Sequence, residues 1–450
     1  MASAVEQFAS NFTFASFSKA EELHRRLWFT LQALLVYRIG TYIPLPGIDP
    51  HIWNEIFNQK SGGVLDMFNM FSGGSLKRMT LFALGIMPYI SASIIMQILT
   101  SMSPQMEAMK KEGEGGRKKL NQYTRYFTIL LATIQSYGLS VGLESMHGSA
   151  SSAVIHPGLF FRITTVITIV GGTIFLMWLG EQITARGVGN GQSLIIFSGI
   201  VAGIPPAIGA ILVQGQQGDI SAITIFGILA MVVGVVAFIV FMERAQRRII
   251  LQYPKRMVGN RMSAGDSSHM PLKLNTSGVI PPIFASSLLL LPLTIVGFSG
   301  LGKGSDVMDT VARYLQHGQP VYMALYGGLI VFFAFFYTAI VFNPDETAEN
   351  LRKYGGFVPG YRPGQATADY MDYVLTRITV IGAGYLVFVC LLPEMLIAKF
   401  SLPFYFGGTS LLITVSVMMD TVAQIQSHLF AHHYEGTSLF KKARKRELKK

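Results

Sequence analysis

Ten apolar stretches, each long enough to cross a lipid bilayer as a helix, run through this chain of 450 residues. The hydrocarbon core of a bilayer requires roughly 20 apolar residues in helical form. Only 14% of the residues are charged, whereas soluble domains carry about 25%. We therefore predict an all-α integral membrane protein. The predicted spans are residues 23–43, 79–100, 120–142, 159–180, 192–213, 220–242, 277–298, 320–342, 373–397 and 406–429.

The distribution of Lys and Arg predicts the orientation of these spans. Positive charges near span ends are retained on the cytoplasmic side of a membrane. Most of the 36 Lys and Arg lie near the N-terminus, between the second and third spans, and after the sixth, eighth and tenth spans. We therefore predict that both termini, residues 1–22 and the basic tail 430–450, are cytoplasmic.

Two cytoplasmic segments, residues 243–276 and 343–372, are too long and too polar to be simple helix connectors. We interpret both as docking surfaces. The first interleaves its arginines with Tyr253 and His269, which suits a partner rich in phosphate. The alternative is that these charges only retain the loop in the cytoplasm. The arginines concerned are Arg247, Arg248, Arg256 and Arg261.

A short apolar stretch, GGVLDMFNMFSGGS at residues 62–75, lies between the first two spans and is bracketed by glycine pairs. It is far too short to cross a bilayer. A half-helix buried in a cavity fits it, because irregular backbone at membrane depth survives only inside protein or against water. An interfacial amphipathic helix fits the stretch equally well.

The second and seventh spans combine glycine, proline and serine in a way that a lipid anchor does not need. The second contains Gly85, Pro88, Ser91, Ser93 and Gln97, and the seventh begins SGVIPPIFASS at residues 277–287. Small residues permit close helix contact, and proline leaves a backbone carbonyl free. We predict that these two spans form a seam that moves.

Seven runs of sequence resemble the SecY family of protein-translocation channels. They are FNMFSGG (68–74), TLFALGIMPYISASIIMQIL (80–99), KKEGEGGRKK (110–119), WLGEQITARGVGNGQSLII (178–196), FNPDETAENL (342–351), FVPGYRPG (357–364) and PFYFGGTSLLI (403–413). They occur in the family's order over nearly the whole chain.

The resemblance implies ten helices in two pseudo-symmetric halves, residues 23–213 and 214–429, around a central hourglass pore. It implies a channel of the bacterial inner membrane that translocates unfolded secretory polypeptides and releases membrane helices sideways through a lateral gate. The implied partners are the subunits SecE and SecG, the motor ATPase SecA, the ribosome, signal sequences, unfolded preproteins and membrane lipid. Neither catalysis nor a cofactor is expected.

The resemblance also assigns residues to roles. A plug, residues 62–76, contains Phe68, Asn69, Met70, Phe71, Ser72, Gly73 and Gly74. The lateral gate includes Ser91, Ser93, Gln97, Gln135 and Asn275. The pore ring consists of Ile86, Ile90, Gln192, Ile196, Ile283 and Ile413. Ile86 and Ile90 are four residues apart and share one helix face.

Two of these assignments have local readings of their own. The family often has an aliphatic residue where this chain has Gln192, so the ring has five or six members, or Gln192 lies just above the constriction. Arg362 matches an arginine that the family uses to engage SecA and the ribosome. Pro359, Gly360, Pro363 and Gly364 predict a turn that displays its guanidinium.

The rival hypothesis is a secondary transporter, which needs several charges within the membrane. Asp420 is the only acid that we place well inside a span. The run GFSGLGKG at 297–304 resembles a phosphate-binding loop but has Gly304 where Ser or Thr is required. His428, His432 and His433 lack accompanying carboxylates, so we predict no metal site.

Overall fold

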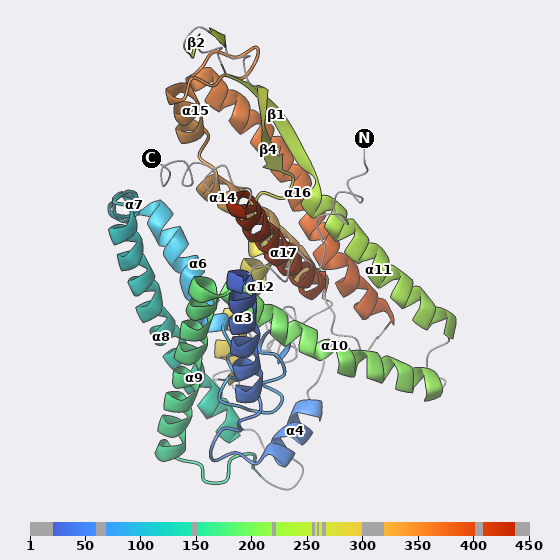
Figure 1. Ribbon diagram of the computed structural model, residues 1–450. Helices are drawn as coiled ribbons and strands as arrows, with labels where there is room; N and C mark the ends of the chain where they lie inside the picture. The colour runs from blue at the N-terminus through green and yellow to red at the C-terminus, as the bar shows by residue number, and fades with distance from the viewer. Residues whose placement is uncertain are drawn as a thin grey trace.

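The computed structural model describes residues 21–59, 69–145, 152–217, 222–253, 257–258, 261–262, 267–298, 319–400 and 408–436, and these are mostly α-helical (Figure 1). The helices are α3 (Glu21–Gly40), α4 (Pro50–Gln59), α6 (Met87–Met102), α7 (Pro104–Lys111), α8 (Glu114–Ser145), α9 (Leu159–Arg186), α10 (Gly191–Gln217), α11 (Ala222–Arg244), α12 (Ile280–Phe298), α14 (Pro320–Val341), α15 (Pro344–Lys353), α16 (Gln365–Phe400) and α17 (Gly408–Gly436).

Each of the ten predicted spans overlaps one helix of the described part. Seven of these helices, α8 to α11, α14, α16 and α17, are long and apolar enough to cross a membrane. Residues Met87–Met102 and Ile280–Leu289 form shorter apolar helices, and α3 covers the first predicted span. The agreement follows from the length of the apolar runs, because a backbone in lipid must satisfy its hydrogen bonds within the helix.

The start of the second span differs from the prediction of a helix from residue 79. Residues 79–86 form turns, and α6 begins only at Met87. Met79 and Gly85 have φ angles of 45° and 56°, which no right-handed helix accepts. The Leu45 N–H donates to the Met79 carbonyl (2.9 Å), and the Leu81 N–H donates to the Ile43 carbonyl (3.2 Å). These bonds to the segment after α3 replace the missing helical bonds.

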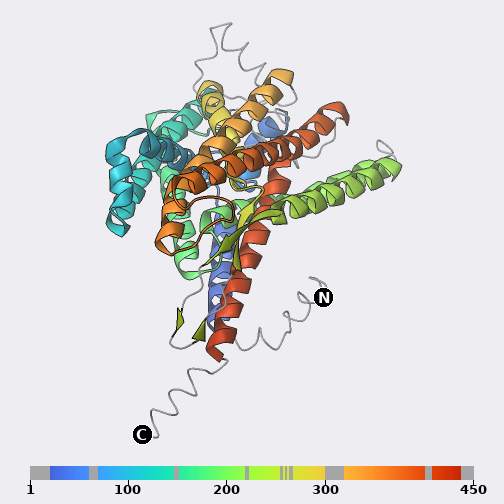
Figure 2. The ribbon, with the colours of Figure 1, turned by 90° about the horizontal axis from the view of Figure 1, so that it is seen from above.

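The helices pack around one continuous hydrophobic core. In the first part of the chain, α8 packs on α6 and α9, and α10 packs on α9 and α3. In the second part, α14 packs on α12 and α16, and α17 packs on α16 and α11. Contacts of α12 with α6 and α8, and of α10 with α17, join the two parts (Figures 1 and 2).

Two arginine–glutamate pairs hold α8 against α9, one toward each end of the helix pair. Arg125 Nε and Nη2 donate to the two carboxylate oxygens of Glu181 at 2.9 and 2.7 Å. Near the opposite ends, Arg162 donates to Glu144 Oε2 at 2.6 Å, and Glu144 Oε1 accepts from the Gly158 N–H. The geometry fixes the register of α8 on α9, because both ends are tied.

A two-stranded hairpin extends from the bundle. Strands β1 (Gln246–Gln252) and β4 (Ser267–Lys273) pair antiparallel, and the short strands β2 (Met257–Val258) and β3 (Arg261–Met262) pair beyond them. Ile249, Leu251 and Leu272 of the hairpin pack with Met371 and Val374 of α16 in a second hydrophobic cluster. We call the end of the bundle with the hairpin, α15 and α7 the hairpin end (Figure 1).

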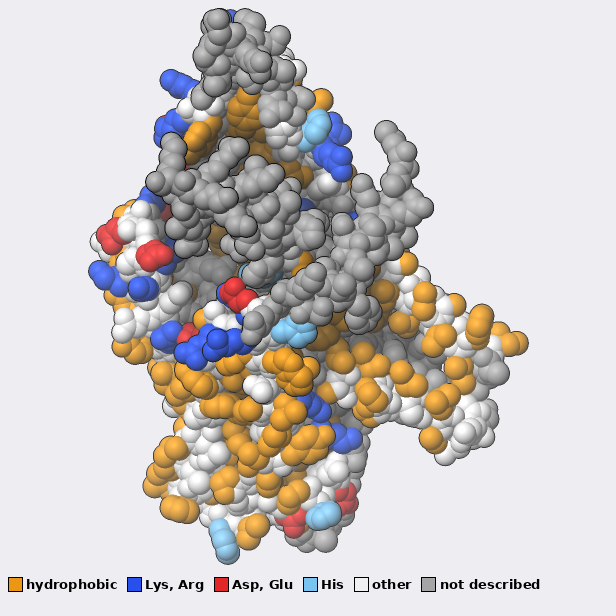
Figure 3. Space-filling view, in the orientation of Figure 1, with side chains coloured by type: hydrophobic (Ala, Val, Ile, Leu, Met, Phe, Trp, Pro, Cys, Tyr) orange, Lys and Arg blue, Asp and Glu red, His pale blue; other side chains and the backbone are white. Residues whose placement is uncertain are grey.

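Hydrophobic side chains dominate the surface below the hairpin end. On the face in Figure 3, many of the Lys and Arg lie toward the hairpin end, and hydrophobic side chains are spread widely over the helices below it. Exposed apolar residues on α3 and α11 include Trp28, Leu35, Phe226 and Phe241. The second half of α10 and α11 project from the bundle in both ribbon views (Figures 1 and 2). Such a surface suits lipid or an apolar partner.

Candidate functional site

The isoleucines assigned to the ring come from four helices of the core. Ile86 immediately precedes α6 and Ile90 lies in its first turn, where the Ile90 N–H donates to the Ile86 carbonyl at 3.2 Å. Ile196 lies on α10, Ile283 on α12 and Ile413 on α17. All five side chains are buried in the same hydrophobic cluster. The arrangement therefore places five aliphatic side chains from distant parts of the sequence in one core.

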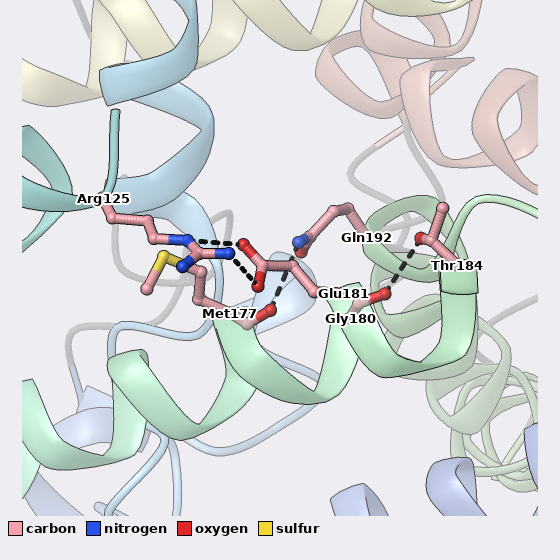
Figure 4. A network of polar contacts seen from close by, with 6 residues as sticks. All are labelled: Arg125, Met177, Gly180, Glu181, Thr184 and Gln192. Carbon is pink, nitrogen blue, oxygen red and sulfur yellow. Dashed lines mark hydrogen bonds and ion pairs between the residues drawn. The ribbon is translucent and has the colours of Figure 1, made fainter. Parts of the chain in front are cut away.

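Gln192, the sixth residue assigned to the ring, lies against α9 (Figure 4). Its Nε2 donates to the Met177 carbonyl at 3.5 Å, and its amide group covers Gly180, where a Cβ atom would lie 2.6 Å from Gln192 Oε1. The Arg125–Glu181 pair lies alongside (Figure 4). The contacts of the Gln192 side chain are thus with α9, one turn away from Ile196 along α10.

The segment assigned to the plug is described from Asn69 onward, and Phe68 lies outside the described residues. Phe71, Ser72 and Gly73 are buried, and Asn69 and Met70 are partly buried. The Tyr37 hydroxyl donates to the Ser72 carbonyl (3.3 Å), and Arg38 Nη1 donates to the Gly73 carbonyl (3.2 Å). The turn around Ser72 is therefore enclosed by protein, and of the two hypotheses these contacts favour a buried position over an interfacial helix.

Helices α6, α8 and α12 pack on one another and carry several buried polar side chains. Of the residues assigned to the gate, Ser91 and Gln135 are buried, and Gln97 Nε2 donates to Ser93 Oγ at 3.5 Å. Four further serines in these helices are buried, and of them only the two of α8 were missed in the sequence, because the two of α12 belong to the run 277–287. These are Ser136 and Ser140 of α8, which lie one turn apart, and Ser286 and Ser287 of α12. The α6, α8 and α12 contact, with these serines and glutamines, is called the polar seam below.

Asn275 lies at the base of α12, where it bonds to α11. Its Nδ2 donates to Glu243 Oε1 at 2.6 Å and to the Gly278 carbonyl at 3.1 Å, and its Oδ1 accepts from the Ser277 hydroxyl at 3.2 Å. Glu243 was not singled out in the sequence. The available signal was its position as the second-last residue of a very apolar span. Asn275 therefore ties the segment that precedes α12 to α11.

The two segments interpreted as docking surfaces form one block at the hairpin end. Gln252 of β1 and Phe357 exchange backbone hydrogen bonds of 2.9 and 3.0 Å, which join the hairpin to the second segment. Arg247 and Arg248 are exposed on β1, and Arg362 is exposed in the turn before α16. Arg261 lies in β3, and Arg256 lies outside the described residues.

The backbone of the Arg362 turn is held on both sides. Gly360 and Gly364 have φ angles of 90° and 112°, the Thr367 hydroxyl donates to the Arg362 carbonyl (2.8 Å), and the Tyr361 ring stacks on Tyr370 with centroids 4.2 Å apart. The predicted turn is thus present in the structure. It presents an exposed guanidinium from a fixed backbone.

A comparison with protein families matches residues 80–422 to the family SecY, which is more than half of the chain. The chain belongs to the SecY family. The protein translocase subunit SecY of Escherichia coli strain K12 is 54% identical over 422 residues, which cover 94% of this chain and 95% of that protein. The resemblance found in the seven sequence runs is therefore confirmed.

Solved structures share the fold of this SecY-family chain. One is a SecY structure that concerns the plug domain, which in that protein stabilises the closed state of the translocation channel and maintains a membrane seal. That chain is 19% identical to this one, with a TM-score of 0.68. The match covers 93% of this chain and 95% of that chain. Another is Sec61 in the canine ribosome–channel complex, with 19% identity, a TM-score of 0.66 and the same coverages. The predicted fold, with ten helices in two halves, is confirmed.

Cofactor chemistry finds no support among the described residues. No group of three or more His, Cys, Asp or Glu side chains there could hold a metal ion. The run 297–304 lies almost entirely outside the described residues. Asp420, the acid that the transporter hypothesis needs within the membrane, is exposed on α17. Membership of the SecY family does not favour a small-solute transporter.

Proposed function

We propose that this chain is the protein-conducting channel subunit of a bacterial protein translocase and works as a conduit, not as an enzyme. The observation that carries the proposal is the match of residues 80–422 to the SecY family together with a channel fold. Unfolded secretory polypeptides cross the membrane through its centre, and apolar helices of membrane proteins leave through its side.

The neck of the channel is the ring of Ile86, Ile90, Ile196, Ile283 and Ile413. Water in a narrow apolar neck loses hydrogen bonds that it cannot recover, so the neck empties and excludes ions. The burial of all five side chains in one cluster supports this role. The contacts of Gln192 with α9 favour a ring of five members, with Gln192 outside it.

Gln192→Leu is expected to leave the conductance of the neck unchanged. The test uses an Ile90→Asn background, whose neck is expected to conduct, so that a change in either direction can be measured. The side chain at this position rests on Gly180 and Met177, so its polarity does not reach the neck. Single-channel recording in planar bilayers measures the conductance. A reduced leak in the double variant would place Gln192 in the ring.

The plug, residues 62–76, closes the channel, and the polar seam is its lateral gate. Not all polar atoms of the seam form hydrogen bonds. Gln135 Oε1 and Ser287 Oγ are buried and have no hydrogen-bond partner in the described part of the chain. A buried polar atom without a partner costs free energy, so this seam is weaker than an apolar contact of the same size. An apolar signal helix that separates α12 from α6 and α8 gives these groups access to water.

The block at the hairpin end is the docking surface for SecA and the ribosome, and the arginines Arg247, Arg248, Arg256, Arg261 and Arg362 provide its charge. A neighbour of the same fold, Sec61, is bound to a ribosome. Guanidinium groups bind carboxylate and phosphate with two hydrogen bonds each, which suits both a protein motor and ribosomal RNA. The joined backbone of the hairpin and the Arg362 turn supports a single surface.

The chain spans the bacterial inner membrane several times, with the hairpin end and both termini in the cytoplasm. The gathering of Lys and Arg toward the hairpin end supports this orientation (Figure 3). The apolar surfaces of α3 and of the projecting helices α10 and α11 offer contact areas for SecE and SecG as well as for lipid.

Reconstitution tests the proposal. The chain is purified with its small subunits, inserted into lipid vesicles, and supplied with SecA, ATP and a secretory preprotein. We expect the preprotein to become resistant to external protease, whereas the same preprotein without its signal sequence stays sensitive. A folded complex that protects neither, but accumulates a small solute against a gradient, would favour the transporter instead.

A further inference from the structure

The plug segment is held through its backbone by side chains of α3. The Tyr37 hydroxyl and Arg38 Nη1 donate to consecutive carbonyls, those of Ser72 and Gly73. Tyr37 is almost fully buried, with 1% of its surface exposed, and its ring stacks on Phe82. Arg38 forms no ion pair with an acid of the described residues. The two donors are thus fixed on one helix and directed at one turn.

A contact between two glycines forms the other side of this turn. A Cβ atom on Gly73 would lie 2.9 Å from the Cα atom of Gly199 on α10, and a Cβ atom on Gly199 would lie 3.1 Å from the Cα atom of Gly73. A methyl group on Gly73 would therefore require the backbone to move, and one on Gly199 would press against the turn. Gly73 also has a φ angle of 67°, which favours glycine. The turn therefore lies against the backbone of α10 with no side chain between them.

We propose that Tyr37, Arg38 and Gly199 form a seat that positions the plug in the closed channel. The inference rests on the proposed function of residues 62–76 as a plug. The contacts of the seat are with the carbonyls of Ser72 and Gly73 and with the Cα atom of Gly73. They therefore do not involve plug side chains.

The seat also explains how the plug leaves. The hydrogen bonds of the seat are few, and the net contribution of each to stability is small. Since α3 and α10 both supply contacts, a small separation of these helices removes the donors and the glycine contact together. Tyr37, Arg38 and Gly199 are positioning residues: they act through the plug and do not line the neck.

The test measures docking directly. A single cysteine replaces Ser72, which is buried, in a Cys390→Ser background, and the purified complex in nanodiscs is treated with a water-soluble thiol reagent. The rate of modification reports how often the turn leaves its seat. We expect Tyr37→Phe combined with Arg38→Gln to raise this rate about fivefold or more, as loss of at least one net hydrogen bond implies. Gly199→Ala should raise it by a similar factor.

A matched control lies one turn further along α10. Gly203 has no atom within 4 Å of an added Cβ, so Gly203→Ala should leave the labelling rate unchanged. Tyr123→Phe, on the exposed surface of α8, serves as the control for loss of a hydroxyl group. If Gly199→Ala does not yield a folded complex, the variant at Tyr37 and Arg38 still decides the question, because it adds no atoms to the contact.

Resting conductance of the same complexes separates the seat from the sealing role of the plug. Faster labelling with raised conductance supports both. Faster labelling with wild-type conductance would support the positioning role of the seat and contradict the sealing role of the plug. Labelling at the wild-type rate in both seat variants overturns the seat, whatever the conductance.

Discussion

Ile90→Asn and Ile283→Asn are each expected to raise the resting ion conductance of the complex well above the wild-type background. A carboxamide in the neck offers hydrogen bonds to water, so the neck stays wet and ions follow. The same wetting lets the new side chain remain hydrated. We therefore expect the free energy of unfolding to fall only slightly. By contrast, truncation of an isoleucine packed in a dry core to a small residue lowers the free energy of unfolding by about 2–5 kcal/mol. Planar-bilayer recording and thermal unfolding of the purified complex measure the two effects.

The matched control is Ile167→Asn on α9. Ile167 has 67% of its surface exposed on the apolar exterior, so the same chemical change there alters lipid contact but not the neck. It should conduct like the wild type. Silent recordings from both neck variants, together with a fall in unfolding temperature, would assign Ile90 and Ile283 to ordinary packing and remove them from the ring.

Arg362→Glu is expected to abolish SecA-driven export while the chain stays folded and bound to its small subunits. The guanidinium is exposed on a turn whose backbone is fixed by Gly360, Gly364 and the Thr367 hydroxyl, so its removal costs the fold little. A charged hydrogen bond to a partner contributes about 1.5–3 kcal/mol, and a glutamate replaces it with repulsion. Protease protection of a preprotein in vesicles measures export.

Arg352→Glu provides the comparison. Arg352 is also exposed, lies ten residues earlier in the same segment, and undergoes the same change in charge. It lies in the last turn of α15 and not in a glycine-bounded loop such as the Arg362 turn. We expect a modest reduction of export at most. Equal loss in both variants would show that the total charge of the segment matters and that Arg362 has no special place in it. Export at the wild-type rate in Arg362→Glu would contradict the docking role itself.

Most of the fold could be predicted because hydropathy alone determines which segments enter lipid. It predicts the crossing segments but not the full helices: α16 begins at Gln365, eight residues before the predicted span. The hairpin was missed, although Ile249 and Leu251 alternate with exposed residues in the pattern of a half-buried strand. The long polar loop around them concealed this signal.

The site was predictable to a lesser degree, because its geometry depends on contacts between distant residues. A contact between two glycines such as Gly73 and Gly199 cannot be recognised in a single sequence, because a glycine can occur for several structural reasons. The hydrogen bonds that Tyr37 and Arg38 donate to backbone carbonyls could not be predicted either, because every residue type has a backbone carbonyl. Gln192 shows the same limit, because only the position of α9 reveals where its amide group points.

The unusual backbone at Met79 bears on how easily the gate opens. A residue other than glycine at a φ angle of 45° raises the free energy of the chain by about 1–3 kcal/mol. Met79 lies between the plug turn and α6, and its carbonyl is held by the Leu45 N–H. If opening of the proposed gate moved α6 and allowed Met79 to relax, this free energy would be returned. Each 1.4 kcal/mol returned multiplies the open population about tenfold, so a weakly bound signal helix can suffice to open the channel.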